Sequence, residues 1–388
     1  MKVVGIICEY NPIHKGHIYH ITETKKALGD DAAVVCCMSG NFVQRGEPAI
    51  FSKFARAKAA VMCGADLVIE LPTVFALSSA EGFAHGAVKL LDSLGVCTHI
   101  SFGSEEGETA KLDKIVDTLL SPETDTKIKK ELESGISYAA ARQNALKSII
   151  GENADIIEKP NNILGIEYLK ALKIIHSDMQ PVTVPRCGGD HDGEKGYSAS
   201  AVRNALKNGS YDWDIVPEKA AEIFKNEIAE GKGPVFSETV EQAILYRLRT
   251  MTEKEYDELP YASEGLGQRL RKSVLTSTSL AEILEKTKTK RYAMSRIRRM
   301  VMCAYLGLTS DDMNAEPEYI RVLGANEKGR EILKKMRKTA ALPVITKAAD
   351  ASELLKESIF TDLYTLAYPN ASQRKSGADS TTSPYIEK

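Results

Sequence analysis

Residues 1–17 read MKVVGIICEYNPIHKGH, and this stretch decides the fold. Val3–Cys8 is an apolar run of the kind that forms a strand buried on both faces of a sheet. NPIHKGH comes next, and it places His14, Gly16 and His17 on the first turn of the following helix. Backbone N–H groups and the helix dipole make such a helix start favourable for anions. The opening of the chain therefore predicts a strand, a turn and a helix that together hold an anionic ligand.

The alternation of strands and helices continues through the first half of the chain. The predicted strands are Val3–Cys8, 32–38, 66–71, 98–102 and 182–185, and the predicted helices follow His17 and cover 52–64, 79–94, 160–176 and 198–207. Repeated strand–helix–strand units are typical of an α/β fold with a parallel, doubly wound, Rossmann-like sheet. Ligands in such folds bind at the carboxyl ends of the strands.

The second half of the chain has a different composition. After Trp213 it consists of long charged helices with few strand-like runs. We therefore predict a domain boundary near residue 210, with an α/β domain over 1–210 and a mainly helical domain over 211–388. The stretch SQRKSGADSTTSP, residues 372–384, is rich in serine, glycine and charge, and we expect it to be loose.

Composition excludes several classes of protein. A net charge of −2 gives no global attraction to nucleic acid or membrane, so any such surface is local. The chain has neither the pattern of a signal peptide nor an apolar stretch of the ~18–20 residues that span a bilayer. Its seven cysteines are scattered without a C-x-x-C pair, which is typical of free thiols in a reducing compartment. We expect a soluble cytoplasmic protein with no membrane partner and no protein-held metal.

His14 and His17 are the predicted catalytic residues. Imidazole groups at a helix start can donate to phosphate oxygens while an α-phosphate is attacked, which is the help that nucleotidyl transfer mainly needs. Gly16 lacks the Cβ that would keep a phosphate chain away from the backbone. The alternative is a pair of core or surface histidines, and a metal pair would need a third ligand that the sequence does not show.

A second constellation, SASAVR, opens the helix predicted at 198–207. Ser198 is a good N-cap, and Ser200 and Arg203 can hold a leaving pyrophosphate because arginine binds phosphate with two parallel hydrogen bonds. Ordinary helix capping explains the same pattern equally well when it stands alone. Lys53 and Arg56 lie one turn apart after a polar loop, and we expect them either to close on a carboxylate or triphosphate or to form a solvated helix face.

The two motifs in this order resemble the nucleotidyltransferase superfamily that shares its H-x-G-H signature with class I aminoacyl-tRNA synthetases. The second motif of that superfamily runs Ser-Ser-Thr-x-x-Arg, and here Ala199 and Ser200 replace its middle serine and its threonine. The likeness narrows to the tRNA(Met) cytidine acetate ligases. It rests on GIICEYNPIHKGH (5–17), SGNFVQRGEPAIFSK (39–53), ADLVIELP (65–72), SFGSEE (101–106), PNNILGIEYLKAL (160–172), SASAVR (198–203), SEGLGQRL (263–270) and KRYAMSRIRRM (290–300).

This resemblance implies a reaction and a set of ligand contacts. Acetate and ATP would give acetyl-adenylate and pyrophosphate, and the acetyl group would pass to N4 of the wobble cytidine of elongator tRNA(Met). ATP is a substrate accompanied by Mg²⁺, and no tightly bound cofactor is expected. The implied ATP contacts are Ile7, Cys8, Glu9, Tyr10, Asn11, Pro12, His14, Gly16, His17, His20, Gly103, one of Asn161 and Asn162, and Arg186.

Several of these contacts have simpler explanations. Gly103 ends a predicted strand at the ligand edge of the sheet, and it is equally well explained as a turn glycine. Asn161 and Asn162 follow Pro160 at a helix start, where one of them can be a plain N-cap. Arg186 follows a strand as an anion-binding arm would, and a surface salt bridge is the alternative.

A basic segment in the second half indicates an RNA partner. Seven Lys and Arg side chains fall between 286 and 299 without an intervening acid, and Tyr292, Met294, Ile297 and Met300 form an apolar stripe at near-helical spacing. Such local charge fits a folded RNA that is recognised through its phosphates and shape. A solvated charged helix is the alternative. The predicted tRNA contacts are Lys288, Lys290, Arg291, Arg296, Arg298 and Arg299.

Sequence reasoning thus favours an ATP-dependent ligase and leaves two rivals. One is an adenylyltransferase that transfers AMP to a small cofactor precursor. The other is a non-catalytic RNA-binding protein with a relic nucleotide pocket. The residues alone do not specify acetate, the tRNA base or the oligomeric state.

Overall fold

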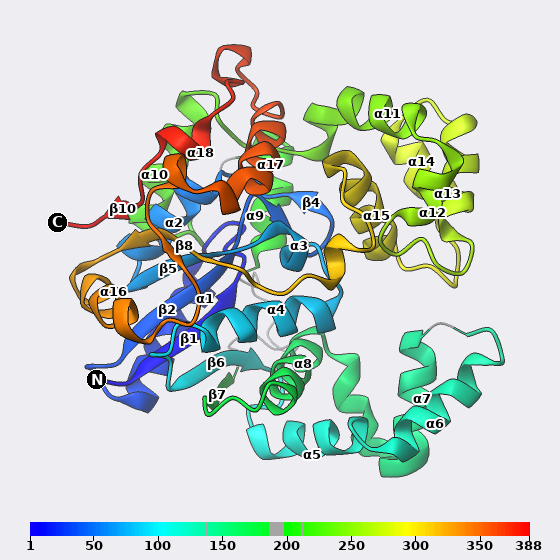
Figure 1. The fold of residues 1–388 in the computed structure, drawn as a ribbon, viewed down its shortest axis with the longest axis horizontal. Helices are drawn as coiled ribbons and strands as arrows, with labels where there is room; N and C mark the ends of the chain where they lie inside the picture. Colours follow the sequence, from blue (N-terminus) through cyan, green and yellow to red (C-terminus); the bar gives the residue numbers. More distant parts are fainter. Residues whose placement is uncertain (137, 186–197, 211–212) are drawn as a thin grey trace.

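The computed structural model describes residues 1–136, 138–185, 198–210 and 213–388 (Figure 1). Its centre is a sheet of eight strands, seven of them in the order β10-β8-β5-β2-β1-β6-β7, with β9 paired to β8. The strands of this sheet are β1 (Val3–Cys8), β2 (Ala33–Ser39), β5 (Leu67–Leu71), β6 (His99–Ser104), β7 (Gln180–Pro185), β8 (Ile320–Ala325), β9 (Val344–Ile345) and β10 (Tyr385–Ile386). All neighbours pair in parallel except β5 and β8. The predicted α/β class with a mostly parallel sheet is confirmed.

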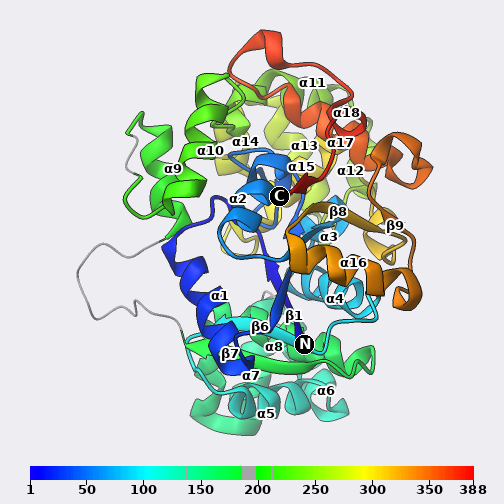
Figure 2. The same cartoon turned by 90° about the vertical axis from the view of Figure 1, so that its left-hand side faces the viewer.

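Helices cover both faces of the sheet, as a doubly wound fold requires. One face packs on α4, α5, α8 and α16 and the other on α1, α2, α9 and α10, each through its own apolar core. Figure 2 shows α10 beside α2, against which it packs. The bounds are α1 (Lys15–Leu28), α2 (Lys53–Met62), α4 (Ala80–Asp92), α5 (Thr109–Leu119), α8 (Pro160–Ile174), α9 (Ala199–Lys207), α10 (Glu218–Ala229) and α16 (Glu327–Thr339).

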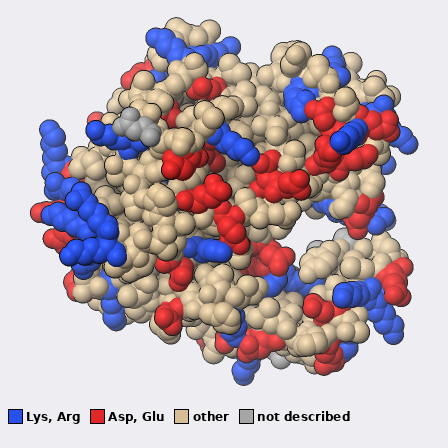
Figure 3. Space-filling model, in the orientation of Figure 1, with Lys and Arg blue, Asp and Glu red and all other residues tan. Residues whose placement is uncertain are grey.

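Two helical projections extend from this body, and the surface is hollowed between them (Figures 1 and 3). One is the pair α6 (Pro122–Leu132) and α7 (Tyr138–Ile150). The other is a helical region with its own core, built from α11 (Glu241–Thr250), α12 (Glu253–Glu258), α13 (Leu266–Leu275), α14 (Leu280–Thr287), α15 (Met294–Leu306) and α17 (Leu355–Thr365). The short elements are α3 (Thr73–Ala76), α18 (Ala378–Thr381) and the hairpin strands β3 (Phe42–Val43) and β4 (Glu47–Pro48).

Local signals placed the elements of the first half well. Each predicted strand overlaps an observed one, and Ser52, Ser79 and Ser198 cap α2, α4 and α9 through their side-chain oxygens. Serine is a favoured N-cap because it accepts a hydrogen bond from an otherwise unpaired N–H group of the first turn. His14 differs from the prediction, because it precedes α1 as its N-cap instead of lying inside the first turn.

The second half of the chain is helical but not separate from the sheet. β8 adds to β5 in antiparallel fashion and β10 adds to β8, so residues 211–388 supply one edge of the sheet. The core of the helical region likewise includes Phe42 and Leu77 from the first half. The domain boundary near residue 210 stays a prediction. Residues from each side of it pack into the sheet or the core of the other side.

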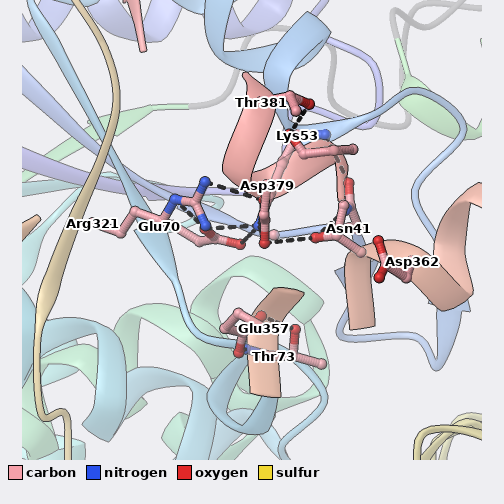
Figure 4. A network of polar contacts seen from close by, with 12 residues as sticks. Asn41, Lys53, Glu70, Thr73, Arg321, Glu357, Asp362, Asp379 and Thr381 are labelled. Atoms are coloured by element: carbon pink, nitrogen blue, oxygen red, sulfur yellow. Dashed lines mark hydrogen bonds and ion pairs between the residues drawn. The ribbon is translucent and has the colours of Figure 1, made fainter. Parts of the chain in front are cut away.

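A buried network of charges joins the two halves (Figure 4). Lys53 Nζ lies 2.7 Å from Glu70 Oε1 and 3.0 Å from Asp379 Oδ1, and Arg321 lies 3.1 Å from the same Asp379 atom. All four side chains are at most 4% exposed. The expectation that residues 372–384 are loose is therefore wrong, because Asp379 anchors this stretch in the interior.

Candidate active site

The candidate site lies at the topological switch point of the sheet, where the chain begins to add strands on the opposite side of β1. From β1 the chain proceeds to β2 and β5 on one side, and β6 and β7 lie on the other, so adjacent connections diverge beyond the carboxyl ends of β1 and β6. Such a switch point is the usual ligand crevice of an open α/β sheet. The NPIHKGH segment occupies it, because it connects β1 to α1.

His14 and His17 form a reciprocal cap at the start of α1. The Gly16 backbone N–H donates to His14 Nδ1 over 3.1 Å, and the His14 backbone N–H donates to His17 Nδ1 over 3.1 Å. Because each Nδ1 accepts a hydrogen bond, the proton of each neutral ring is on Nε2. The cap therefore fixes the tautomer in which Nε2 can donate to a phosphate oxygen.

The two imidazole rings also pack against each other, which restricts the orientation of both. Their centroids are 3.8 Å apart, and the ring of Tyr10 meets the His17 ring edge-on with centroids 4.9 Å apart. Tyr10 has a left-handed backbone conformation (φ 46°), which is uncommon for a residue with a side chain and clusters at functional sites. His14 is 5% exposed and Tyr10 2%, so of these three rings His17 is the most accessible.

Gly16 has a more specific role than the one predicted. A Cβ at this position would lie 2.9 Å from His14 Cε1 and 3.0 Å from its Nδ1. The absence of a side chain therefore makes room first for the His14 ring that caps the helix. Asn11 is buried as well, and its Oδ1 accepts a hydrogen bond from the Ile50 N–H over 2.8 Å. Its Oδ1 therefore holds the loop, and its backbone carbonyl accepts from Arg203.

The structure brings the second motif onto the first. Arg203 donates through Nη1 to the Asn11 carbonyl over 2.8 Å and through Nη2 to Ser200 Oγ over 3.0 Å. Burial lowers the pKa of the Arg203 guanidinium, and the nearby carboxylates of Glu9 and Glu47 oppose that shift. Two segments 192 residues apart thus meet at the carboxyl end of β1, and the positive charge of Arg203 lies beside the NPIHKGH loop.

Glu9 is the acidic group of this loop. Its Oε1 accepts a hydrogen bond from the Gln44 backbone N–H over 2.8 Å, which ties the loop to the β3–β4 hairpin. Burial raises the pKa of Glu9, and the Gln44 N–H and the charges of Arg203, Arg56 and Arg45 partly offset the rise. Arg45 belongs, with Gln44 and Glu47, to the polar loop before Lys53 that the sequence predicts to close on the carboxylate or triphosphate. The hairpin itself was not predicted, because its strands are too short for a periodic pattern.

The predicted roles of Lys53 and Arg56 are wrong, because both side chains are buried. Lys53 is 1% exposed and belongs to the charge network, and Arg56 is fully buried. The Arg56 guanidinium donates to the carbonyls of Phe51, Glu9, Ser39 and Gly40, which join the ends of β1 and β2. Burial lowers its pKa. Arg56 therefore positions the loops of the site and does not contact ligand.

The remaining predicted ATP contacts differ in accessibility. Asn162 is 1% exposed, and its Oδ1 accepts from the N–H groups of Glu105 and Glu106 while its Nδ2 donates to the Ile156 carbonyl. The half-buried Asn161 is the more accessible of the pair. Gly103 lies in the last part of β6, paired with Val184 of β7.

Five predicted contacts remain, of which Ile7 is half-buried and Cys8 and Pro12 are buried. His20 Nε2 lies 2.9 Å from Ser101 Oγ, one turn along α1 from His17. Arg186 lies outside the described residues. No group of three His, Cys, Asp or Glu side chains suited to a metal ion occurs within the ranges described, and no helix there is long and apolar enough to span a bilayer.

The predicted tRNA contacts divide into exposed and engaged groups. Lys288, Lys290 and Arg291 are exposed, and Arg291 pairs with Glu264 over 3.2 Å. The three arginines of α15 are half-buried and make internal contacts: Arg296 with Tyr261, Ser263 and Glu264, Arg298 with Glu47 over 2.5 Å, and Arg299 with the Gln44 carbonyl and the Tyr261 ring. Tyr292, Ile297 and Met300 of the predicted apolar stripe are buried.

Comparison with known proteins agrees with this geometry. The family model described as HIGH Nucleotidyl Transferase matches residues 1–379. The tRNA(Met) cytidine acetate ligase of Acetivibrio thermocellus is 41% identical over 410 aligned residues, covering 98% of this chain and 99% of that protein. The enzyme of the same name from Caldanaerobacter subterraneus subsp. tengcongensis is 43% identical over 392 residues, covering 95% and 96%.

A solved structure has the same fold over its whole length. The crystal structure of Thermotoga maritima TmcAL bound with alpha-thio ATP superposes with a TM-score of 0.92 at 36% identity and covers 100% of this chain and 99% of that one. The apo form of the same protein gives a TM-score of 0.93. The chain therefore belongs to the HIGH nucleotidyl transferases and, within them, to the family of tRNA(Met) cytidine acetate ligases.

Proposed function

We propose that this chain is a cytoplasmic ligase that activates acetate with ATP and transfers the acetyl group to N4 of the wobble cytidine of elongator tRNA(Met). One observation carries the proposal: Arg203 holds the SASAVR and NPIHKGH motifs together at the switch point of the sheet. Family membership adds the substrates, because the relatives that match over nearly the full length bear this name.

In the first step a carboxylate oxygen of acetate attacks the α-phosphorus of ATP, and the bond to the bridging oxygen of pyrophosphate breaks. Negative charge grows on the phosphate oxygens, and the Nε2–H groups of His14 and His17 donate to them. Ser200 and Arg203 hold the departing pyrophosphate through hydrogen bonds and charge. The helix dipole of α1 acts in the same direction.

Mg²⁺ accompanies ATP in this proposal. Glu9 is the carboxylate with which the loop would hold the ion, and phosphate and water oxygens would complete its ligands. When bound, the ion offsets negative charge on the triphosphate. In the second step the N4 amine of cytidine attacks the acetyl carbonyl carbon. AMP leaves, the amine loses one proton, and no covalent bond to the protein forms.

Exchange of pyrophosphate with ATP tests the first step without RNA. We expect acetate-dependent exchange that falls by about 10²-fold or more in His14→Ala and in His17→Ala, since each variant removes one donor to the transition state. Thr239→Trp, an exposed substitution on another element, is the control. Near-normal exchange in either histidine variant would refute its catalytic role.

The same assay separates the rival functions. An adenylyltransferase acting on a cofactor precursor would release pyrophosphate without any acid. A non-catalytic RNA-binding protein would bind tRNA without consuming ATP. If exchange appears only after tRNA is added, the ligase proposal stands and tRNA binding precedes activation.

A further inference from the structure

A large cavity adjoins the candidate active site on the side away from the sheet. It has a volume of about 750 Å³ and lies between α9, the β3–β4 hairpin, the segment 235–241, α14 and α15. Ser200 and Arg203 form part of its wall. A ligand in the cavity therefore reaches the groups that hold the departing pyrophosphate in the proposed reaction.

The cavity extends from this wall toward the basic segment. Lys288, an exposed residue of that segment, lines it, and so does Arg298 of α15. Arg298 also pairs with Glu47 of the hairpin, so one ion pair joins the helical region to the active-site side of the cavity. The cavity is thus a continuous path from the phosphate-binding residues to the surface where we expect RNA.

The lining combines the groups that an unstacked nucleobase needs. Phe236, Leu280 and Met294 are the apolar part of its lining, and a base can stack against the half-buried ring of Phe236. Lys207, also in the lining, has its Nζ 5.8 Å from the centre of that ring. Arg45 and Glu47 belong to the polar part. A guanidinium donates to base carbonyls, and a carboxylate accepts from the exocyclic amine of cytosine.

The cavity is much larger than acetate, the smallest of the substrates. Acetate has four heavy atoms, whereas a space of this volume is typical of sites for whole organic ligands of ~300–1,000 Å³. We place the adenosine part of ATP in the crevice at the carboxyl ends of β1 and β6, so that ATP reaches this cavity only with its triphosphate, at the wall formed by Ser200 and Arg203. The polynucleotide is the substrate that remains.

We propose that this cavity receives the acceptor nucleotide of the RNA in an unstacked conformation, with its base on the apolar part of the lining and its backbone toward Lys288. The inference rests on the proposed function. It adds that the second substrate approaches between the hairpin and α14–α15 and passes Arg203 and Ser200 after pyrophosphate has left, so that the base amine can reach the acyl-adenylate.

Filling the cavity tests this proposal. Ser237 and Ala281 line it from two different elements, and both have small side chains. We expect Ser237→Trp and Ala281→Trp to lower kcat/KM for acetyl transfer to an anticodon stem–loop RNA at least about tenfold, because a displaced base no longer reaches the acyl group. Acetate-dependent pyrophosphate exchange should stay within about twofold, as for other surface substitutions.

Thr239→Trp is the matched control, because it adds the same ring two residues from Ser237 outside the lining. Equal transfer by Ser237→Trp, Ala281→Trp and Thr239→Trp would overturn the proposal. A raised KM for acetate in exchange would also overturn it and assign the cavity to the acid.

Fluorescence anisotropy of the labelled stem–loop measures RNA binding independently of chemistry. We expect weaker binding by the two cavity variants than by Thr239→Trp, and equal affinity would count against the cavity. If the unsubstituted protein binds the RNA but catalyses neither exchange nor transfer, the proposed function fails. The anisotropy comparison would then still decide whether the cavity holds RNA.

Discussion

His14 has two nitrogens with two different tasks. Nδ1 accepts the Gly16 N–H and so caps α1, while the tautomer that this bond fixes leaves the ring proton on Nε2. Stability and catalysis are therefore joined in one side chain. Replacement by alanine removes both functions at once and cannot tell them apart.

A pair of substitutions separates the two tasks. Asparagine is a good N-cap but its short side chain has no donor at the position of Nε2, so His14→Asn should keep the cap and lose the transition-state contact. We expect both His14→Asn and His14→Ala to lose exchange about 10²-fold. His14→Ala should also lower the free energy of unfolding by about 0.5–2 kcal/mol in urea titrations, and His14→Asn by less. Robust exchange by His14→Asn would show that the ring serves only as a cap.

At the scale of elements, the β3–β4 hairpin connects the active site to α15. The Gln44 N–H donates to Glu9, the Gln44 carbonyl accepts from Arg299, and Glu47 pairs with Arg298. Gly46 makes the close approach possible. A Cβ there would lie 2.3 Å from the Arg299 backbone nitrogen and 2.4 Å from the Arg298 carbonyl carbon.

Gly46→Ala should therefore push the hairpin away from α15 and disturb Glu9 indirectly. Gly307→Ala is a matched control, because both glycines have a left-handed φ (76° and 72°) but nothing lies within 4 Å of a Cβ at Gly307. The control should cost about 1–2 kcal/mol of unfolding free energy from the backbone alone. Gly46→Ala should cost more in thermal or urea denaturation and also lower the exchange rate. Equal effects of the two substitutions on both measurements would contradict this coupling.

The elements also show what could be predicted from the sequence. β1, β2 and β5 are buried apolar runs, β6 is mostly buried, and α2, α4 and α9 begin at serine caps, so local physical signals located them. β7 was located by its short run Val182–Pro185, although only Val184 of that strand is buried. β3 and β4 have two residues each, too few for a periodic pattern. The place of β8 at the sheet edge depends on pairing with β5, roughly 250 residues earlier, and no local preference encodes that choice.

The candidate site divides in the same way. Its two motifs were predictable because each has a residue pattern that phosphate chemistry requires. The burial of Lys53 and Arg56 could not be predicted from the sequence. Their partners Glu70, Asp379 and the carbonyls around Gly40 come from other parts of the chain. A basic residue beside a polar loop is indistinguishable from a solvated one until the tertiary partners are placed.

At the scale of the whole molecule, the buried charges hold the end of the chain to the sheet. Lys53 and Arg321 face the carboxylates of Glu70 and Asp379, and Glu357 of α17 adds a third acid nearby (Figure 4). Glu357 accepts hydrogen bonds from the Thr73 backbone N–H and hydroxyl, both over 2.7 Å. Three acids and two bases leave a surplus negative charge, which is costly to bury.

Protonation of Glu357 removes that charge. Burial raises its pKa to about 7, with Glu70 adding to the shift and Lys53 opposing it. Between about pH 4.5, where the unfolded carboxyl titrates, and pH 7, the native state thus binds the extra proton. The stability of the protein must fall as pH rises through this window, because there the unfolded state holds fewer protons.

Glu357→Gln abolishes this titration while keeping the Thr73 contacts, because its amide oxygen accepts the N–H and its amide nitrogen can donate to the hydroxyl. We expect its free energy of unfolding, relative to the unsubstituted protein, to rise between pH 4.5 and pH 7.5 by up to about 3 kcal/mol. Urea titrations at the two pH values measure the change.

Glu255→Gln is the control for that comparison. The Thr252 backbone N–H and other hydrogen bonds lower the pKa of Glu255 to about 2, so its ionised form adds stability that is lost only as pH falls through about 4.5 toward 2. The effect of this control substitution should therefore change little between pH 5.5 and pH 7.5, while that of Glu357→Gln still rises. If the Glu357→Gln difference stays constant across the same range, Glu357 is already ionised at pH 5.5 and its burial does not raise its pKa.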